Sequence, residues 1–440
     1  MATLPTASNE SENGVEPRIT VGLDIGTSKV CALIASYDED SDNLNILGIG
    51  ITDSEGLNRG VVVNIDKTVK TIKKVIEQAE QQAGITIEEV VVGIAGDHIE
   101  AFQSRGIIGI SNNNREIIQE DVDRIIKESR NIKLPPERSI LHVIPQEFII
   151  DGQDGITAPI GMSGVRMEAN VHVVTGLSTA IQNLYKCVER NGIKVKDIVL
   201  EPLACSHAVL NEEEKEVGVG LIDIGGGTTD IAIFEANVIR FTSVFGVAGK
   251  QVTDDIRKGL GIIASQAERI KREYGHGFVN SIMNDEVFMI PGIGGRKPIE
   301  INKSFLCKII QPRLEEIFEF ALAEIRRSGY GGSLGAGVVI TGGATLIPGV
   351  DEVAAEILGM PVKIGYPSGI SYQGLAPEVE SPMYSTCVGL ALYGVKKAKE
   401  AGIDVEDQSD ESSRSKEKSK SGKKEKKGWG ETIKNFLNDI

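Results

Sequence analysis

The sequence is poor in cysteine and has no paired arrangement of it. Its 440 residues hold five cysteines, an odd number, with no CxxC pair. This count and scatter argue against a disulfide framework or a zinc site and favour a reducing compartment. The cysteines are Cys31, Cys187, Cys205, Cys307 and Cys387.

Signals for export and for membrane spanning are missing as well. The first 17 residues, MATLPTASNESENGVEP, are polar and acidic, without the basic and apolar parts of a signal peptide. No apolar run reaches the roughly 18 residues needed to cross a bilayer. We therefore expect a cytosolic protein unless some segment anchors it.

Length and composition indicate a globular α/β protein of more than one domain. Apolar residues make up 41% of the chain, and 50 residues are glycine. The net charge of −16 argues against nucleic acid as a partner of the body. Residues 414–427 differ, with eight Lys or Arg against two Glu. This basic segment predicts an anionic partner for the tail alone.

An internal near-duplication is the strongest functional signal. LDIGTSK at 23–29 is matched by IDIGGGTTD at 222–230, and each lies between two apolar runs, which predicts a β-hairpin tip. Glycines let backbone N–H groups approach phosphate oxygens, hydroxyls add donors, and an aspartate suits a hydrated Mg²⁺. The residues expected at phosphate and Mg²⁺ are Asp24, Gly26, Thr27, Ser28, Lys29, Asp223, Gly225, Gly226, Gly227, Thr228, Thr229 and Asp230, with Asp24 and Asp223 reaching the metal through water.

Either loop alone fits an ordinary hairpin turn equally well. Two loops matched in register and order favour a clamp that holds a triphosphate from both sides. Neither loop is a Walker A motif or a Rossmann fingerprint, because no helix follows and the glycine spacing differs.

Together with the turn ITGGA at 340–344, these loops resemble the signature of the actin, heat-shock chaperone and sugar kinase superfamily. The resemblance implies two lobes with ATP and Mg²⁺ in the cleft and hinges at the connecting segments 201–204 and 384–391. It places Glu201 near the attacking water. The residues that it places at adenosine are Gly249, Lys250, Glu268, Lys271, Gly342, Gly343 and Ala344. For Glu268 and Lys271 the alternative is a solvated i,i+3 ion pair on a helix.

The C-terminus predicts an amphipathic helix. Its large apolar residues, which fall on one helical stripe, are Trp429, Ile433, Phe436, Leu437 and Ile440. The basic residues just before it include Lys423, Lys424, Lys426 and Lys427. A short apolar helix beside cations favours binding to anionic membrane lipids. Docking onto the protein's own core or into a partner's groove are the alternatives. One such helix binds weakly, so stable attachment needs several copies held together.

Within the superfamily these features resemble the FtsA family of bacterial division proteins. The resemblance rests on the insert at 88–165, IPGIGGR at 290–296, QPR at 311–313 and the linker–helix ending. It implies filaments on the cytoplasmic face of the cell membrane at the division site, contact with other division proteins, and capture of the C-terminal peptide of FtsZ by residues 248–328. Arg296 and Arg313 could pair with that acidic peptide or lie in local ion pairs.

The expected fold is therefore a two-lobed actin-like ATPase of the α/β class, with an inserted α+β subdomain (1C type) and a C-terminal amphipathic helix. Helices are expected at 66–83, capped by Asp66, and near 116–130. The expected divisions are 1–17 disordered lead, 18–87 first lobe core (1A), 88–165 insert (1C), 166–205 first lobe core, 206–247 second lobe core (2A), 248–328 helix-rich subdomain (2B), 329–383 second lobe core, 384–401 return helix to the first lobe, 402–427 charged flexible linker and 428–440 amphipathic membrane-targeting helix.

Three other classes share the ATP loops. A metabolite kinase would need a general base aimed at a substrate hydroxyl, and the sequence offers none that is convincing. A heat-shock chaperone needs a β-rich peptide-binding domain where only a charged linker and thirteen residues remain. A pilus-assembly or cell-shape relative of actin usually lacks either the terminal helix or the insert. ATP binding is expected, with weak or no hydrolysis.

Overall fold

The computed structural model describes residues 18–39, 41–111, 114–290, 297–372 and 374–400. Within these ranges no helix has both the length and the apolar character to cross a bilayer. All five cysteines are buried free thiols, as expected from their scatter.

The first lobe is built on a five-stranded sheet in the order β11–β6–β1–β2–β3. Its strands are β1 (Arg18–Ile25), β2 (Lys29–Asp38), β3 (Asn43–Asp53), β6 (Glu89–Ile94) and β11 (Lys194–Leu200). Helices α1 (Ile65–Ala83) and α3 (Ser178–Glu189) cover one face, and α4 (Glu201–Val209) and α11 (Ser385–Glu400) the other. Because both faces are covered, β1 and β2 are apolar almost throughout.

Helix α1 begins one residue earlier than its apolar spacing predicts. Asn64 is its N-cap, and its side chain accepts a hydrogen bond from the Lys67 N–H at 3.0 Å. Asp66, expected as the cap, lies in the first turn instead, where a negative charge favours the helix dipole. Asparagine and aspartate both cap helices, and here the extended backbone conformation of Asn64 makes that residue the cap.

The second lobe repeats this plan with a sheet in the order β14–β13–β12–β17–β18. Its strands are β12 (Val219–Ile224), β13 (Thr229–Glu235), β14 (Val238–Phe245), β17 (Val338–Thr341) and β18 (Val362–Ile364). In the first lobe, β1 forms a hairpin with β2 and pairs in parallel with β6. In the second lobe, β12 likewise forms a hairpin with β13 and pairs in parallel with β17, which lies far along the chain. Helices α6 (Gly249–Leu260), α8 (Lys303–Ser328) and α9 (Val350–Leu358) share the apolar core on one face of this sheet.

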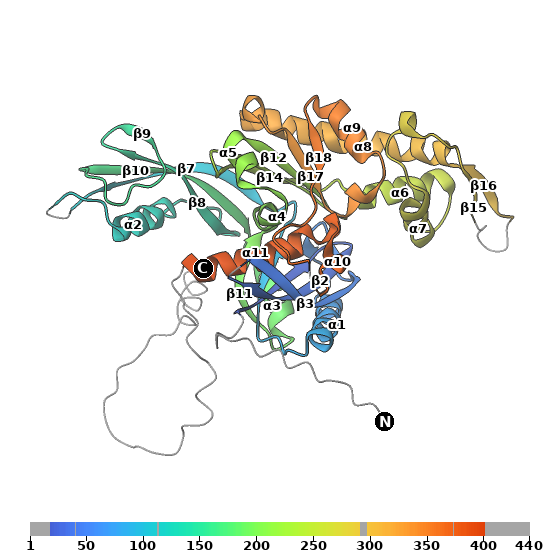
Figure 1. The fold of residues 1–440 in the computed structure, drawn as a ribbon, viewed down its shortest axis with the longest axis horizontal. Coiled ribbons are helices and arrows are strands. Elements are labelled where there is room, and N and C mark those ends of the chain that lie inside the picture. Colours follow the sequence, from blue (N-terminus) through green and yellow to red (C-terminus); the bar gives the residue numbers. More distant parts are fainter. Residues whose placement is uncertain (1–17, 40, 112–113, 291–296, 373, 401–440) are drawn as a thin grey trace, which may run out of the picture.

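A four-stranded antiparallel sheet in the order β7–β10–β8–β9, packed on α2 (Gln119–Ser129), forms a separate unit (Figure 1). Its strands are β7 (Glu100–Gly109), β8 (Arg138–Ile150), β9 (Gln153–Ile156) and β10 (Arg166–Leu177). The boundaries expected at 88 and 165 miss two strands. β6 pairs within the first-lobe sheet, whereas β10 is an inner strand of the four-stranded sheet. β6 is mostly apolar, whereas β10 mixes polar and apolar residues, and the pairing partners of each strand show which unit it joins.

At the opposite end of the molecule, α6 and α7 (Ala264–Tyr274) lie beside the hairpin of β15 (Val287–Ile290) and β16 (Ile299–Asn302), which leads into α8 (Figure 1). The remaining short elements are β4 (Leu57–Asn58), β5 (Val61–Val62), α5 (Glu212–Val217), η1 (Val279–Ser281), η3 (Gly331–Ser333), η4 (Gly343–Leu346), α10 (Ala376–Val379) and η5 (Pro382–Tyr384).

Candidate functional site

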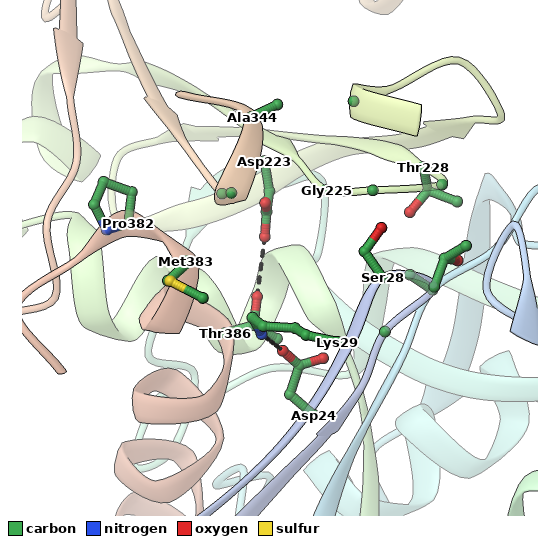
Figure 2. Close-up of a pocket in the computed structure, with 18 of the residues that line it drawn as sticks. Asp24, Ser28, Lys29, Asp223, Gly225, Thr228, Ala344, Pro382, Met383 and Thr386 are labelled. Carbon is green, nitrogen blue, oxygen red and sulfur yellow. Dashed lines mark hydrogen bonds and ion pairs between the residues drawn. The ribbon is translucent and has the colours of Figure 1, made fainter. Parts of the chain in front are cut away.

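A cavity of about 320 Å³ lies where the two repeated hairpins meet (Figure 2). Residues 24–29 (the first loop) line it from the first lobe. From the second lobe it is lined by residues 223, 225–228 and 230 of the segment 223–230 (the second loop). The predicted residues on its wall are Asp24, Gly26, Thr27, Ser28, Lys29, Glu201, Asp223, Gly225, Gly226, Gly227, Thr228, Asp230, Gly249, Glu268, Lys271, Gly342, Gly343 and Ala344. The fold thus brings together residues from six separate stretches of sequence.

The two loops touch tip to tip. A Cβ placed on Gly226 would lie 2.6 Å from the Ser28 Cβ, and one placed on Gly227 would lie 2.7 Å from the Thr27 Cβ. Real side chains do not approach so closely, so this contact requires glycine at both positions. Each loop also closes on itself through one backbone bond, Gly26 N to Lys29 O and Gly225 N to Thr228 O, both 3.0 Å.

Buried acidic groups dominate the charge of the cavity. The Asp24 carboxylate is paired with the Lys29 ammonium, and Asp223 Oδ2 accepts a hydrogen bond from Thr386 Oγ1 at 3.0 Å (Figure 2). Burial would lower the pKa of Lys29, but the Asp24 carboxylate outweighs it and the pKa is raised above its ordinary value. Lys29 therefore stays charged.

Three further carboxylates of the cavity, those of Asp223, Asp230 and Glu201, resist ionisation. Burial, reinforced by the charge of Asp24, raises the pKa of Asp223 to about 6. Burial also raises the pKa of Asp230 and of Glu201 well above their usual range, with neighbouring aspartates adding to the effect. Asp230 Oδ1 is buried without a hydrogen-bond partner. Such a cluster favours a bound cation, which would stabilise the ionised carboxylates.

The buried carboxylates of the cavity fit Mg²⁺, which prefers oxygen ligands. Among the residues that the structure describes, no group of three or more His, Cys, Asp or Glu could hold a metal ion directly. Mg²⁺ retains several waters in most protein sites, and carboxylates reach it through them. Asp24 and Asp223, from the two opposed loops, both line the cavity.

The α6–α7 side of the cavity carries the residues matched to adenosine contacts. Lys271 Nζ donates to Gly249 O at 3.1 Å and to Thr253 Oγ1 at 2.9 Å, and lies 2.7 Å from Glu268 Oε2. The Lys271 side chain is only 10% exposed. The Glu268–Lys271 pair is therefore not the solvated surface pair of the alternative interpretation, because it joins α7 to the start of α6.

Two predicted residues do not line the cavity. Thr229, the first residue of β13, is fully buried and its hydroxyl donates to Val247 O at 2.8 Å. Lys250 has an exposed side chain, and only its backbone N–H reaches the second loop, at Gly226 O, 2.8 Å. In both cases the preceding residue lines the cavity, whereas the side chain of the predicted residue does not.

Arg313, predicted as a partner contact, does not line this cavity. Arg313, in α8, is in a local ion pair with Asp255 at 2.6 Å and also pairs with Glu316. Arg296, the linker at 402–427 and the terminal helix at 428–440 lie outside the described residues.

The cavity also has lining residues that the motifs did not single out. Gly60, in the turn between β4 and β5, donates its N–H to Thr27 Oγ1 at 2.9 Å. Pro382, Met383 and Thr386 come from the start of α11 and the turn before it. The sequence predicts a hinge between the lobes at 384–391, but no spacing in it indicates that a hydroxyl of this segment reaches Asp223.

Two matching sheets, each with a glycine hairpin directed at a shared cavity, define an actin-like ATPase fold. Solved structures agree. The PilM–PilN type IV pilus biogenesis complex aligns with a TM-score of 0.61 at 17% identity over 86% of this chain and 98% of that chain. MreB5 of Spiroplasma citri bound to ADP aligns with a TM-score of 0.55 at 17% identity over 88% and 99%. At these identities the likeness shows the fold alone.

Sequence comparison identifies the family. Residues 220–389 match Cell division protein FtsA, and residues 96–175 match the SHS2 domain inserted in FTSA. Cell division protein FtsA of Pseudomonas aeruginosa is 45% identical over 383 residues, which cover 87% of this chain and 91% of that protein. The chain belongs to the FtsA family of cell division proteins. The expected family, fold and role in cell division are confirmed, and the kinase, chaperone and pilus or cell-shape alternatives are set aside.

Proposed function

We propose that this protein binds ATP with Mg²⁺ in the cavity between its two glycine loops and uses the bound nucleotide to control its assembly at the division site. The contact between Gly226 and Ser28 carries this proposal, because it brings two sets of backbone N–H groups to one cavity. A triphosphate held there would touch both lobes. Its presence would therefore favour one arrangement of the lobes over another.

Different residues around the cavity would contact different parts of the nucleotide. The first and second loops would hold the phosphates, and Asp24 and Asp223 would hold Mg²⁺ through water. A bound Mg²⁺ would neutralise phosphate charge and keep the Asp24 and Asp223 carboxylates ionised. Gly342, Gly343 and Ala344 would contact the adenosine together with Gly249, Glu268 and Lys271, all of which line the cavity. The MreB5 structure with ADP gives a fold-level precedent.

Glu201 would orient the attacking water, and turnover would be weak or absent. Burial and three neighbouring aspartates raise the pKa of Glu201 well above its usual range. A carboxyl group that holds its proton does not accept one from water. The nucleotide then acts mainly as a structural ligand.

The membrane and the FtsZ peptide would be bound elsewhere on the chain. The apolar stripe formed by Trp429, Ile433, Phe436, Leu437 and Ile440, next to its lysines, would bind anionic lipid on the cytoplasmic face of the membrane. Polymerised copies would share these weak contacts and hold FtsZ filaments to the membrane. Residues 248–328 would take the FtsZ peptide, with Arg296 and Arg313 as its cationic contacts.

Two assays test the proposal. Calorimetric titration of the full chain with ATP and Mg²⁺ should give saturable binding, which a D24N/D223N variant loses. Co-sedimentation with anionic vesicles should be lost on deletion of 428–440 while nucleotide binding remains. Absence of ATP binding by the unaltered chain would refute the nucleotide site, and vesicle binding without the last thirteen residues would refute the anchor.

A further inference from the structure

Asp223 is held by a hydroxyl from a distant helix. Thr386 is the second residue of α11, and its Oγ1 lies 3.0 Å from Asp223 Oδ2 (Figure 2). Both side chains are buried, with exposures of 7% and 6%. A hydrogen bond to a buried carboxylate is among the stronger polar contacts of a protein, so it fixes the carboxylate orientation.

The other side of the same carboxylate is also confined. A Cβ placed on Gly342 would overlap Asp223 Oδ1 and would lie 2.6 Å from Ile224 O. The backbone of the turn at 340–344 therefore closes against Oδ1, while Thr386 holds Oδ2. These two contacts restrict the Asp223 carboxylate to one orientation, in which it is open only toward the cavity.

A second hydroxyl bond lies beside the first. Ser385, the residue before Thr386, has its Oγ 2.8 Å from Thr341 Oγ1. Thr341 is paired with Asp223 in the register of β17 and β12. Successive residues of α11 thus bond to paired residues at the ends of two second-lobe strands, while the body of α11 packs on β1 and α4 of the first lobe. The start of α11 links the two lobes at the site.

Packing alone does not explain a hydroxyl at position 386. The next two residues, Cys387 and Val388, are fully buried among apolar side chains. Valine has nearly the shape of threonine, so it would fill the same space but could not donate a hydrogen bond to Asp223.

We propose that Thr386 is a positioning residue that orients the Asp223 carboxylate for the hydrated cation of a bound nucleotide. The inference rests on the proposed nucleotide site and extends it to α11, which contributes no part of either glycine loop. Threonine at this position matters for cation-assisted binding and not for nucleotide binding in general.

The test compares affinities of the full chain for a fluorescent ATP analogue in Mg²⁺ and in EDTA. The unaltered chain should bind more tightly with Mg²⁺. In Mg²⁺, T386V should bind the analogue about tenfold more weakly than the unaltered chain. In EDTA the two proteins should bind it equally. T386S, which keeps a hydroxyl, should bind it as the unaltered chain does. S385A is the matched control, since it removes the neighbouring buried hydroxyl bond but leaves Asp223 held, and its Mg²⁺ enhancement should equal that of the unaltered chain.

Circular dichroism and thermal unfolding check that each variant folds, and T386A replaces T386V if the latter does not. The inference is overturned if the variant keeps the full Mg²⁺ enhancement, or if it loses affinity equally in Mg²⁺ and EDTA. Failure of the unaltered chain to bind the analogue in either buffer would instead refute the proposed nucleotide site, and the inference with it.

Discussion

Gly226 of the second loop lies directly against Ser28 of the first loop, with no room for a side chain between them. This contact joins two hairpins that are far apart in the sequence and come from different sheets. The site therefore exists only while the two lobes keep their relative position, and substitutions at this contact should report on both stability and binding.

Substitution of Gly226 by alanine should destabilise the chain. Its Cβ would lie 2.6 Å from the Ser28 Cβ, so one loop must move, at a cost of about 1–3 kcal/mol in the free energy of unfolding. Urea denaturation measures this loss. G332A is the control, because a Cβ there meets no atom within 4 Å.

The same contact predicts a compensating change. Replacing Ser28 by glycine removes the side chain that the new methyl group meets, so G226A/S28G should recover part of the lost stability. Independent, additive losses in the double variant would mean that the loops are not in contact.

Loss of Lys29 should leave the Asp24 carboxylate without its counter-charge. The Asp24 side chain is 6% exposed, and breaking a buried ion pair from one side costs about 3–5 kcal/mol. We expect K29M to lower the free energy of unfolding by about this amount, as measured by urea denaturation. K67M, which breaks an exposed pair with Glu55, should change it by less than about 0.5 kcal/mol.

Removing both partners of that pair should be less harmful than removing the lysine. In K29M/D24N the buried charge is gone, so stability should rise above that of K29M. If the double variant is no more stable than K29M, the pairing seen between these side chains does not explain the loss.

The pKa of Asp223 predicts a dependence of stability on pH. Burial raises this pKa from 3.8 to about 6, so between these values the folded chain holds a proton that the unfolded chain has released. The contribution of Asp223 to the free energy of unfolding is therefore largest at low pH. It falls by about 2–3 kcal/mol in total as the pH rises from the unfolded-state pKa to the folded-state pKa.

Asparagine at position 223 tests this dependence, because it is neutral at every pH. D223N should gain stability relative to the unaltered chain between pH 4 and pH 6, and the gain should level off above pH 6. Urea denaturation of both proteins at several pH values measures the difference. A difference that stays constant with pH would contradict the raised pKa.

Lys271 should contribute to both stability and nucleotide binding. It joins α7 to α6 through hydrogen bonds to Gly249 O and Thr253 Oγ1 and pairs with Glu268. Its removal breaks these charged hydrogen bonds, which costs about 1–3 kcal/mol. K271M should therefore unfold at lower urea and bind ATP more weakly. R269M, which removes a half-exposed arginine from a 4.0 Å pair on the same helix, should change neither property measurably.

Local sequence patterns determined much of the fold and of the site. Apolar runs broken by DIGTS and DIGGGTTD form hairpins because glycine allows the turn and the flanking residues fill both faces of a sheet. Helical spacing of apolar residues placed α1 and α2. These features depend on neighbours within a few residues, so they are visible in the sequence itself.

Only the tertiary structure decided which distant segments meet. β6 and β10 lie close to the expected ends of the insert, and hydrogen bonding to different partner strands assigns them to different sheets. The turn at Gly60 and the hydroxyl of Thr386 reach the cavity through contacts with no local signature. The sequence by itself determined the two loops and their chemistry. The packing of two lobes determined that they face one cavity, because contacts between distant segments depend on the whole core and not on any one stretch of residues.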